Sequence, residues 1–438
     1  MTSDVIEPVQ PGWRATAPSL RVAMDEHAVA WGRIAKSCLF FAVFFSGWSL
    51  LRVGQINLTF SDIAFFACLG IVAVQGRLNL MPFGPLTPYW IAGLAMMLGG
   101  LFVSSIINGD PLRWANVASQ YTVAYLFIPL LLMQQERRLT RILPMLFVLG
   151  TTLSEAIGIA TTFVFTYHDT IGLLGDGFIT GNDRLGAMAG QPNPNGAVVA
   201  FSLPMLIYTL NIKAMPRLLG LVCAVILLWG LMLSASFTGF FACIVAIGLT
   251  LTVLGFRHVV RLGLVMAVAL GLFVASGAPL PKAFQTRVGS AVESGDINQA
   301  GTFVNRSELI AEAWTFAENT TVIGMGVDRY RELSQYDNPV HDLYLLIWNE
   351  GGAVAFVGLM TMLVLLVIMA IAGLKRSRPG GAMACAVVAV FLIYTASYPH
   401  MYSRMWVMPV MVALSVIYVR PEPARGVQDP IPPDPVAA

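Results

Sequence analysis

Charged side chains are scarce in this chain. Of its 438 residues, only 11% are Asp, Glu, Lys or Arg and 57% are hydrophobic, whereas a soluble domain carries about 25% charged residues. This shortage excludes a soluble globular protein and indicates a chain that crosses a membrane several times. The lipid bilayer is therefore the expected partner of most of the surface, and no nucleic-acid partner is expected.

Cysteine motifs, metal-binding pairs and internal repeats are also missing. The cysteines fall inside apolar runs, at spacings that fit neither disulfides nor zinc, so we expect them to be small core residues. The two long polar segments, 167–193 and 278–340, contain no Asp-x-Asp pair, which favours chemistry without a metal ion. Neither a metal nor another cofactor is predicted. The five cysteines are Cys38, Cys68, Cys223, Cys243 and Cys385.

The N-terminal sequence lacks the features of a cleavable leader. Its opening stretch, MTSDVIEPVQPGWRATAPSL, is polar and proline-rich and does not show the charged-then-apolar order of a secretory signal. We therefore expect residues 1–33 to form a cytoplasmic tail.

Apolar runs make up most of the remaining chain. A helix needs roughly 20 apolar residues to cross a bilayer, and about 12 runs reach that length. The predicted fold is an all-α polytopic membrane protein with about 12 transmembrane helices. The runs are 34–53, 57–75, 88–107, 115–134, 142–166, 194–212, 216–234, 236–256, 259–277, 353–373, 381–398 and 401–419.

These runs divide the chain into regions. Most of the 26 Lys and Arg residues then lie in connections on the cytoplasmic side, as the positive-inside rule requires, with both termini cytoplasmic. The predicted regions are the tail 1–33; transmembrane helices 1–9 over 34–277, with an outward loop at 167–193; a large outward loop over 278–340 that contains short helices; a helix start and transmembrane helices 10–12 over 341–419; and a second cytoplasmic tail at 420–438.

The two outward loops face the same compartment and hold the candidate site. Long loops in a compact protein are usually functional, and these concentrate acidic, basic and aromatic side chains. Within the larger loop, residues 305–319 show apolar residues near helical spacing, with Ser307 or Asn305 as a possible cap. A short amphipathic helix lying on the membrane surface is expected there.

The segment PVHDLYLLIWNEGG, residues 339–352, closes the larger loop. Asn338 or Asp337 can cap a helix there, and Pro339 suits its first turn. We expect the helix to run from His341 into the span near Ala353.

A histidine in a first helical turn is held neutral by the helix dipole and can accept a proton. The same helix start attracts a diphosphate. Glu350 points away from His341 in a helix and is a poor direct partner. The alternative is a histidine that is merely hydrogen-bonded at the interface, with Asp342 acting as a first-turn charge.

Other polar residues also have two interpretations each. Arg184, Arg306 and Arg287 either clamp phosphate, to which guanidinium groups are well suited, or anchor the membrane surface. Glu155 lies inside a span, where it must pair or face water. An aromatic cluster flanks the last outward turn and is either an interfacial belt or the lining of a glycan entrance; its members are Tyr394, Tyr398, His400, Tyr402 and Trp406.

Three landmarks stand out between residues 180 and 352. They are Arg184 with Gly186 and Pro192-Asn193-Pro194-Asn195-Gly196; Arg306 through Trp314 leading to Gly324-Met325-Gly326; and His341-Asp342-Leu343-Tyr344-Leu345 with Glu350-Gly351-Gly352. With these landmarks the chain resembles the O-antigen ligase and O-antigen polymerase superfamily of bacterial envelope glycan assembly. There are two departures. The chain has Ser234-Ala235-Ser236 where many members carry an arginine, and Asp342 replaces the more usual asparagine.

The resemblance implies transfer of a glycan from undecaprenyl diphosphate to a sugar hydroxyl, at the periplasmic face of the bacterial inner membrane. The acceptor is lipid A-core in a ligase or a second lipid-linked repeat in a polymerase, and the departures slightly favour a polymerase. A chain-length regulator is a candidate partner. The implied roles are His341 as the base; Arg184, Arg306 and Arg287 as diphosphate ligands; and Asp342, Tyr344, Glu350 and Asn195 as supporting residues.

Functions of other classes stay open. A lipid-linked oligosaccharide flippase or other secondary transporter fits many spans with a buried carboxylate, but such proteins usually show two similar halves. A lipid-monophosphate-dependent glycosyltransferase is disfavoured because residues 52–57, in the first outward loop, contain no acidic side chain. A purely structural membrane protein would leave the arginine-rich insert without a purpose.

Overall fold

The computed structural model describes residues 18–52, 58–133, 135–255, 257, 280–286 and 303–419. Every named element in these ranges is helical. The α-helices are α1 (Pro18–Phe44), α2 (Phe60–Val74), α3 (Thr87–Asn108), α4 (Pro111–Thr122), α5 (Ile128–Leu132), α6 (Arg137–Val164), α7 (Tyr167–Leu174), α8 (Pro192–Asn211), α9 (Arg217–Ser234), α10 (Phe237–Leu254), α12 (Lys282–Phe284), α14 (Phe303–Ala317), α15 (Arg329–Leu333), α16 (Leu343–Arg376), α17 (Arg378–Thr395) and α18 (Arg404–Ser415). Short η segments are η1 (Gly84–Leu86), η2 (Val123–Phe127) and η3 (Ala187–Ala189).

Seven helical segments in the described ranges are long and apolar enough to cross a membrane. This confirms the predicted all-α, multi-pass class. The predicted count of about 12 spans is not shown, because the run 259–277 lies outside the described residues and the helices at four other runs are too short or too polar: α1, α2, α8 and α18. The seven are Gly84–Asn108, Pro111–Leu132, Arg137–Val164, Arg217–Ser234, Phe237–Leu254, Leu343–Arg376 and Arg378–Thr395.

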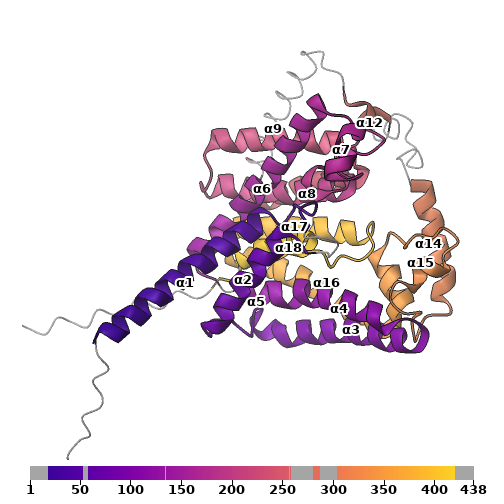
Figure 1. Ribbon diagram of the computed structural model, residues 1–438, viewed down its shortest axis with the longest axis horizontal. Coiled ribbons are helices and arrows are strands. Elements are labelled where there is room, and N and C mark those ends of the chain that lie inside the picture. Colours follow the sequence, from indigo (N-terminus) through magenta and orange to yellow (C-terminus); the bar gives the residue numbers. More distant parts are fainter. Residues whose placement is uncertain are drawn as a thin grey trace, which may run out of the picture.

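The helices form two groups with α17 and α18 between them (Figure 1). One group contains α3, α4 and α16, and the other contains α6, α8 and α9. Within the first group, α16 packs along α3, and small residues let the two backbones approach closely. A Cβ atom added at Gly100 would lie 2.6 Å from the backbone nitrogen of Ala355.

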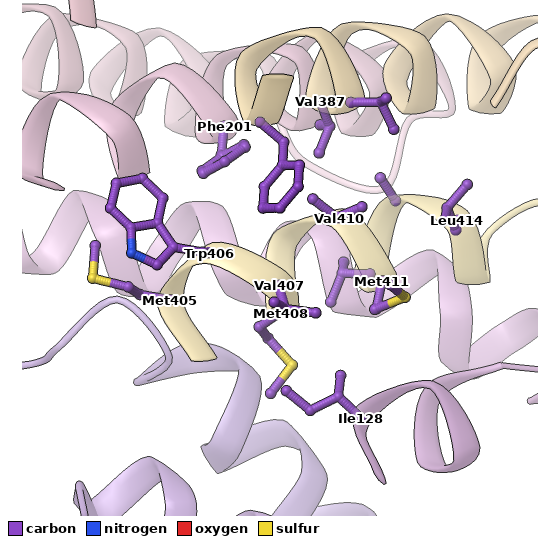
Figure 2. Close-up of a cluster of buried hydrophobic side chains, with 14 of the residues drawn as sticks. Ile128, Phe201, Val387, Met405, Trp406, Val407, Met408, Val410, Met411 and Leu414 are labelled. Atoms are coloured by element: carbon purple, nitrogen blue, oxygen red, sulfur yellow. The ribbon is translucent and has the colours of Figure 1, made fainter. Parts of the chain in front are cut away.

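The short helix α18 forms the centre of the hydrophobic core. Its residues from Arg404 to Ser415 are all buried. In Figure 2, its side chains pack against Phe201 of α8, Val387 of α17 and the Ile128 side chain of α5. The predicted run 401–419 is therefore an internal helix of the bundle, surrounded by protein.

A buried ion pair fixes the start of α18. The Arg404 guanidinium contacts the Asp62 carboxylate of α2, and the two residues are 8% and 1% exposed. The cysteines all lie in helices as free thiols, buried or half-buried, as predicted.

The helices α7, α14 and α15 gather at one end of the bundle, which we call the loop end, and α1 extends beyond the opposite end (Figure 1). Helix α14 confirms the helix expected at 305–319. Because it already begins at Phe303, Ser307 and Asn305 lie inside it, and the prediction that they cap it is wrong. Leu309 and Ala313 face the protein, whereas Trp314 is 62% exposed.

Candidate functional site

His341 lies immediately before the N-cap of α16. Asp342 is that cap: its side chain accepts a hydrogen bond from the Leu345 N–H at 2.9 Å. The expectation that Asn338 or Asp337 caps the helix and that Pro339 starts it is therefore wrong. Asp342 takes the cap because its carboxylate satisfies a donor that the helix itself leaves unpaired.

The helix that follows is also interrupted. Gly352 has a φ of 70°, so α16 consists of two helical pieces joined at this residue. The loop before α15 fills the break, since the Thr321 carbonyl accepts the Ala353 N–H at 2.9 Å and the Glu350 carbonyl accepts the Gly326 N–H at 3.0 Å. The predicted uninterrupted helix from His341 through Ala353 is wrong for this reason. A residue with a side chain at 352 would be strained by the positive φ.

The surroundings of His341 favour a neutral imidazole. Burial lowers its pKa below the usual 6.5, the positive charge of Arg306 lowers it further, and the Pro339 carbonyl partly offsets both. The Nδ1 atom lies 3.1 Å from the Pro339 carbonyl oxygen. If Nδ1 carries the proton and donates it to this carbonyl, Nε2 presents its lone pair and can accept a proton.

Arg184 connects three segments at the loop end. Its Nε donates to the Ser234 carbonyl at 2.9 Å, and its terminal nitrogen donates to the Asn193 side chain at 2.9 Å. Ser234 ends α9 just before the turn to α10. The guanidinium group of Arg184 thus lies at the turn where the chain lacks the arginine that many superfamily members carry.

Tyr394 links the two arginines. Its hydroxyl donates to the Asn193 carbonyl at 3.2 Å, and both Arg184 and Arg306 are close enough to act on it electrostatically. Arg306 also acts on His341. Arg306 thus lies within electrostatic range of His341 on one side and, with Arg184, of Tyr394 on the other. We call the region of these four residues the loop-end site.

Two helix N-termini meet beside Arg184. Helix α8 begins at Pro192, in the Pro/Asn-rich motif just before the predicted run 194–212, and α10 begins after its N-cap Ser236. They pack tightly, since a Cβ atom at Gly196 would lie 2.9 Å from that of Ser236. Unpaired N–H groups at a helix start favour anions. The first turn of α10 contains no proline, whereas Pro192 and Pro194 of α8 have no N–H and the Asn195 N–H is bonded to the Gln191 carbonyl. The start of α10 therefore suits a phosphate better than the start of α8.

The predicted supporting residues divide into two sets. Tyr344 stays near the site, with its hydroxyl 2.8 Å from that of Thr395. Asn195 instead faces the bundle interior, where its amide donates to the Glu155 carboxylate at 3.3 Å. Glu155 is thus paired, one of the two outcomes expected for it.

Glu350 also points away from His341, as expected from helical spacing. One of its oxygens accepts the Asp328 N–H at 3.0 Å, and the other lies 3.4 Å from Nε2 of His400. Arg287 lies outside the described residues.

The sequence did not identify Tyr394 or His400 as parts of a polar network. Tyr394 and Trp406 are buried in the core with ring centroids 5.3 Å apart, so an interfacial belt is wrong for these two. The one feature of the sequence that pointed to Tyr394 and His400 was their clustering with Tyr398 and Tyr402 around the last outward turn.

A separate cavity of about 680 Å³ lies between α1, α2, α5 and the start of α6. Arg33, Lys36 and Arg77 are among its lining residues, and none of the predicted site residues is.

Fold and site together define a multi-pass, all-α membrane protein with a neutral histidine and two arginines at one end. Residues 222–360, about a third of the chain, match the family model described as O-antigen ligase, which confirms the predicted resemblance. The match includes Arg306 and His341 and begins after Arg184. No curated protein matches the chain. The matched family links the chain to polysaccharide biosynthesis by ligase- or polymerase-type glycan transfer.

Proposed function

We propose that this protein transfers a glycan from undecaprenyl diphosphate to a sugar hydroxyl at the loop end, on the periplasmic face of a bacterial inner membrane. The observation that carries the proposal is the grouping of a neutral His341 with Arg306 and, around Tyr394, with Arg184. The family match over residues 222–360 supports the same reaction class.

In the proposed reaction, the acceptor hydroxyl oxygen attacks the anomeric carbon of the donor sugar. Nε2 of His341 takes the hydroxyl proton as the new glycosidic bond forms, and the bond between the sugar and the diphosphate breaks. The diphosphate leaves on its lipid with the bonding electrons. A neutral imidazole is the form that this step requires, and burial and Arg306 favour it.

Arg184 and Arg306 would hold the diphosphate. Negative charge grows on the leaving oxygens in the transition state, and fixed positive groups in a partly buried site stabilise it. The N-terminus of α10 would add N–H donors beside Arg184. Because Arg184 reaches the α9–α10 turn through Ser234, we propose that it replaces the arginine missing there.

Within this class we favour a repeat-unit polymerase over a ligase. The two departures, the arginine-free α9–α10 turn and Asp342 in place of asparagine, occur in motifs that vary more among polymerases. In cells, deletion of a polymerase leaves single repeats on the acceptor, whereas deletion of a ligase leaves full-length chains on the carrier lipid. If deletion of this protein leaves full-length chains on the carrier lipid, the protein is a ligase and not a polymerase.

The test of the reaction is His341→Ala in protein reconstituted into bilayers with a lipid-linked donor. We expect transfer to fall by about 10²–10⁴-fold, the usual contribution of a general base, while thermal stability and donor binding are retained. His168→Ala, at an exposed histidine of α7, is the matched control and should transfer normally. A fully active His341→Ala protein would remove His341 as the base. If the His341→Ala protein still moves the lipid-linked donor across the bilayer, the result would favour the alternative function, a flippase.

A further inference from the structure

A second polar cluster lies apart from His341. It consists of Asp328, from the loop before α15, Glu350, from α16, and His400, from the turn between α17 and α18. One ligand atom from each residue lies within 4.8 Å of the others. Glu350 is seven residues beyond Leu343, the first residue of α16, which places it about 10 Å along the helix from that start.

Two atoms of this cluster are left without a hydrogen bond among the described residues. Glu350 is only 1% exposed, and its Oε2 atom has no such partner; the same is true of the buried Nε2 atom of His400. The two atoms lie 3.4 Å apart, whereas a charge-assisted N–H···O bond is about 2.7–2.9 Å long. The two atoms are therefore in ion-pair contact, but neither forms a hydrogen bond with the other.

The neighbouring groups orient the cluster. The other ring nitrogen of His400, Nδ1, lies 3.3 Å from the Tyr121 hydroxyl. With the proton on Nδ1, the Nε2 lone pair faces the two carboxylates. The other oxygen of Glu350 is held by the Asp328 N–H, and Asp328 has a left-handed backbone, with φ of 61°. Metal-binding histidines and carboxylates are commonly fixed in this way through their second polar atom.

We propose that Asp328, Glu350 and His400 bind one divalent transition-metal cation of the Zn²⁺ type. One imidazole nitrogen and two carboxylate oxygens suit such an ion, with ligand distances of about 2.0–2.2 Å and a water molecule at an open position. The three ligand atoms are now up to 4.8 Å apart, and side-chain rotations would bring them closer together around the bound ion.

The cation would act as a structural clasp. The three ligands come from the 321–328 loop, the first piece of α16 and the 396–403 turn. The loop and α16 both adjoin the break at Gly352, and the turn leads into the buried helix α18. Binding would hold these segments together without contacting His341.

The competing state is an imidazolium–carboxylate pair without a cation. Burial lowers the pKa of His400, but the charge and contact of Glu350 together with the charge of Asp328 raise it by more. In this state His400 carries a second proton. In this state the cluster is stable without a metal ion, and added metal would not stabilise the protein. The two states therefore differ in whether added metal stabilises the protein.

The test uses the full chain in detergent, purified with a tag that contains no histidine and treated with a chelator. Metal content is measured by mass spectrometry after dialysis against Zn²⁺, Mn²⁺ or Ca²⁺ separately, together with the Tm. We expect about one Zn²⁺ or Mn²⁺ per chain and a raised Tm, with Ca²⁺ bound more weakly because imidazole is a poor Ca²⁺ ligand.

Variants assign the site. His400→Gln and Asp328→Asn should each abolish the bound metal and the rise in Tm. Tyr121→Phe should weaken binding by roughly tenfold or more through loss of the group that orients His400. His168→Gln, on the exposed face of α7, should bind as the parent does. An unchanged Tm and no bound metal in the parent protein, or metal retained in both His400→Gln and Asp328→Asn, would overturn the proposal.

Discussion

At the scale of single residues, His341 owes its neutral state to its neighbours more than to its own position. The sequence placed it in a first helical turn, where the dipole would act on it. The structure puts it before the cap, where burial and the charge of Arg306 lower its pKa. The expected neutral form is supported, but through burial and the charge of a side chain on another helix.

The lowered pKa of His341 predicts how transfer depends on pH. A base works only when neutral, so transfer should be lost as the pH falls through the pKa of His341, which lies below the usual 6.5. Arg306→Gln removes one of the causes that lower this pKa. The acid limb of the profile of kcat/KM should therefore move upward, toward 6.5, in addition to any loss of diphosphate binding.

The matched control is Arg329→Gln, which removes an exposed guanidinium group at the same end of the bundle. Its pH profile should coincide with that of the parent. If the acid limb of Arg306→Gln also coincides with that of the parent, the charge of Arg306 does not control the base.

Some residue contacts could not be predicted from the sequence. Glu350 and His400 are 50 positions apart, and their pairing depends on how the last turn folds back on α16. The sequence excluded a direct contact of Glu350 with His341 because helical spacing is local. It gave no means of finding the partner that Glu350 does have.

At the scale of elements, the contact between α3 and α16 depends on small residues. Gly93 and Gly100 of α3 face Gly358 and Gly351 of α16, and added Cβ atoms at these positions would meet backbone atoms or close side chains. Close approach of this kind stabilises helix pairs in membranes by packing. Because α16 follows directly after His341 and Asp342, this contact also positions the candidate base.

We predict that Gly100→Ala destabilises the protein and lowers transfer. The new methyl group would lie 2.6 Å from the Ala355 backbone nitrogen, so α16 must shift. Gly99→Ala is a closely matched control, since nothing lies within 4 Å of the added atom. The Tm should fall by several degrees in the first variant and hold or rise slightly in the second, where alanine is the better helix former. Equal Tm values in the two variants would contradict the close packing.

Local sequence patterns predicted some helix boundaries correctly and others wrongly. The sequence correctly gave a helix at α14, although not its cap, and the run 194–212 falls close to α8, because apolar spacing acts within a few residues. It misplaced the start of α16 and did not foresee the break at Gly352. The break is filled by the Val322 and Gly324 backbone, which approaches Gly352 from an earlier loop, and no pattern within residues 339–352 encodes that approach.

At the scale of the whole molecule, the pair between Asp62 and Arg404 ties an early helix to the buried helix α18. Asp62→Asn would leave the buried Arg404 without this carboxylate, a change that typically costs about 3–5 kcal/mol. The Tm should fall strongly. Glu136→Gln, which breaks the exposed pair with Lys36, should cost about 0–1 kcal/mol.

A double replacement separates charge from packing. In Asp62→Asn with Arg404→Met, both charges are removed, the volume is largely kept and the asparagine oxygen can still accept the hydrogen bonds that Thr59 donates to Asp62. Most of the stability should therefore return. If the double variant is no more stable than Asp62→Asn, α18 depends on the ion pair itself. If Asp62→Asn matches Glu136→Gln, the pair contributes little.

The sequence by itself determined the class of this protein. A shortage of charge and repeated apolar runs require helices in a membrane, and the residues that lipid excludes collect in two loops, with His341 and Arg306 in or next to the larger one. Hydropathy and helix signals act over a few residues, so they can be read along the chain.

Only the tertiary structure decided which distant side chains meet. Asp62 and Arg404 are 342 positions apart. Tyr394 is within electrostatic range of Arg184 and of Arg306 in α14. Asp328, Glu350 and His400 converge from three segments. These contacts are set by how the helices pack, because packing depends on the shapes of whole surfaces and leaves no periodic signal in the sequence.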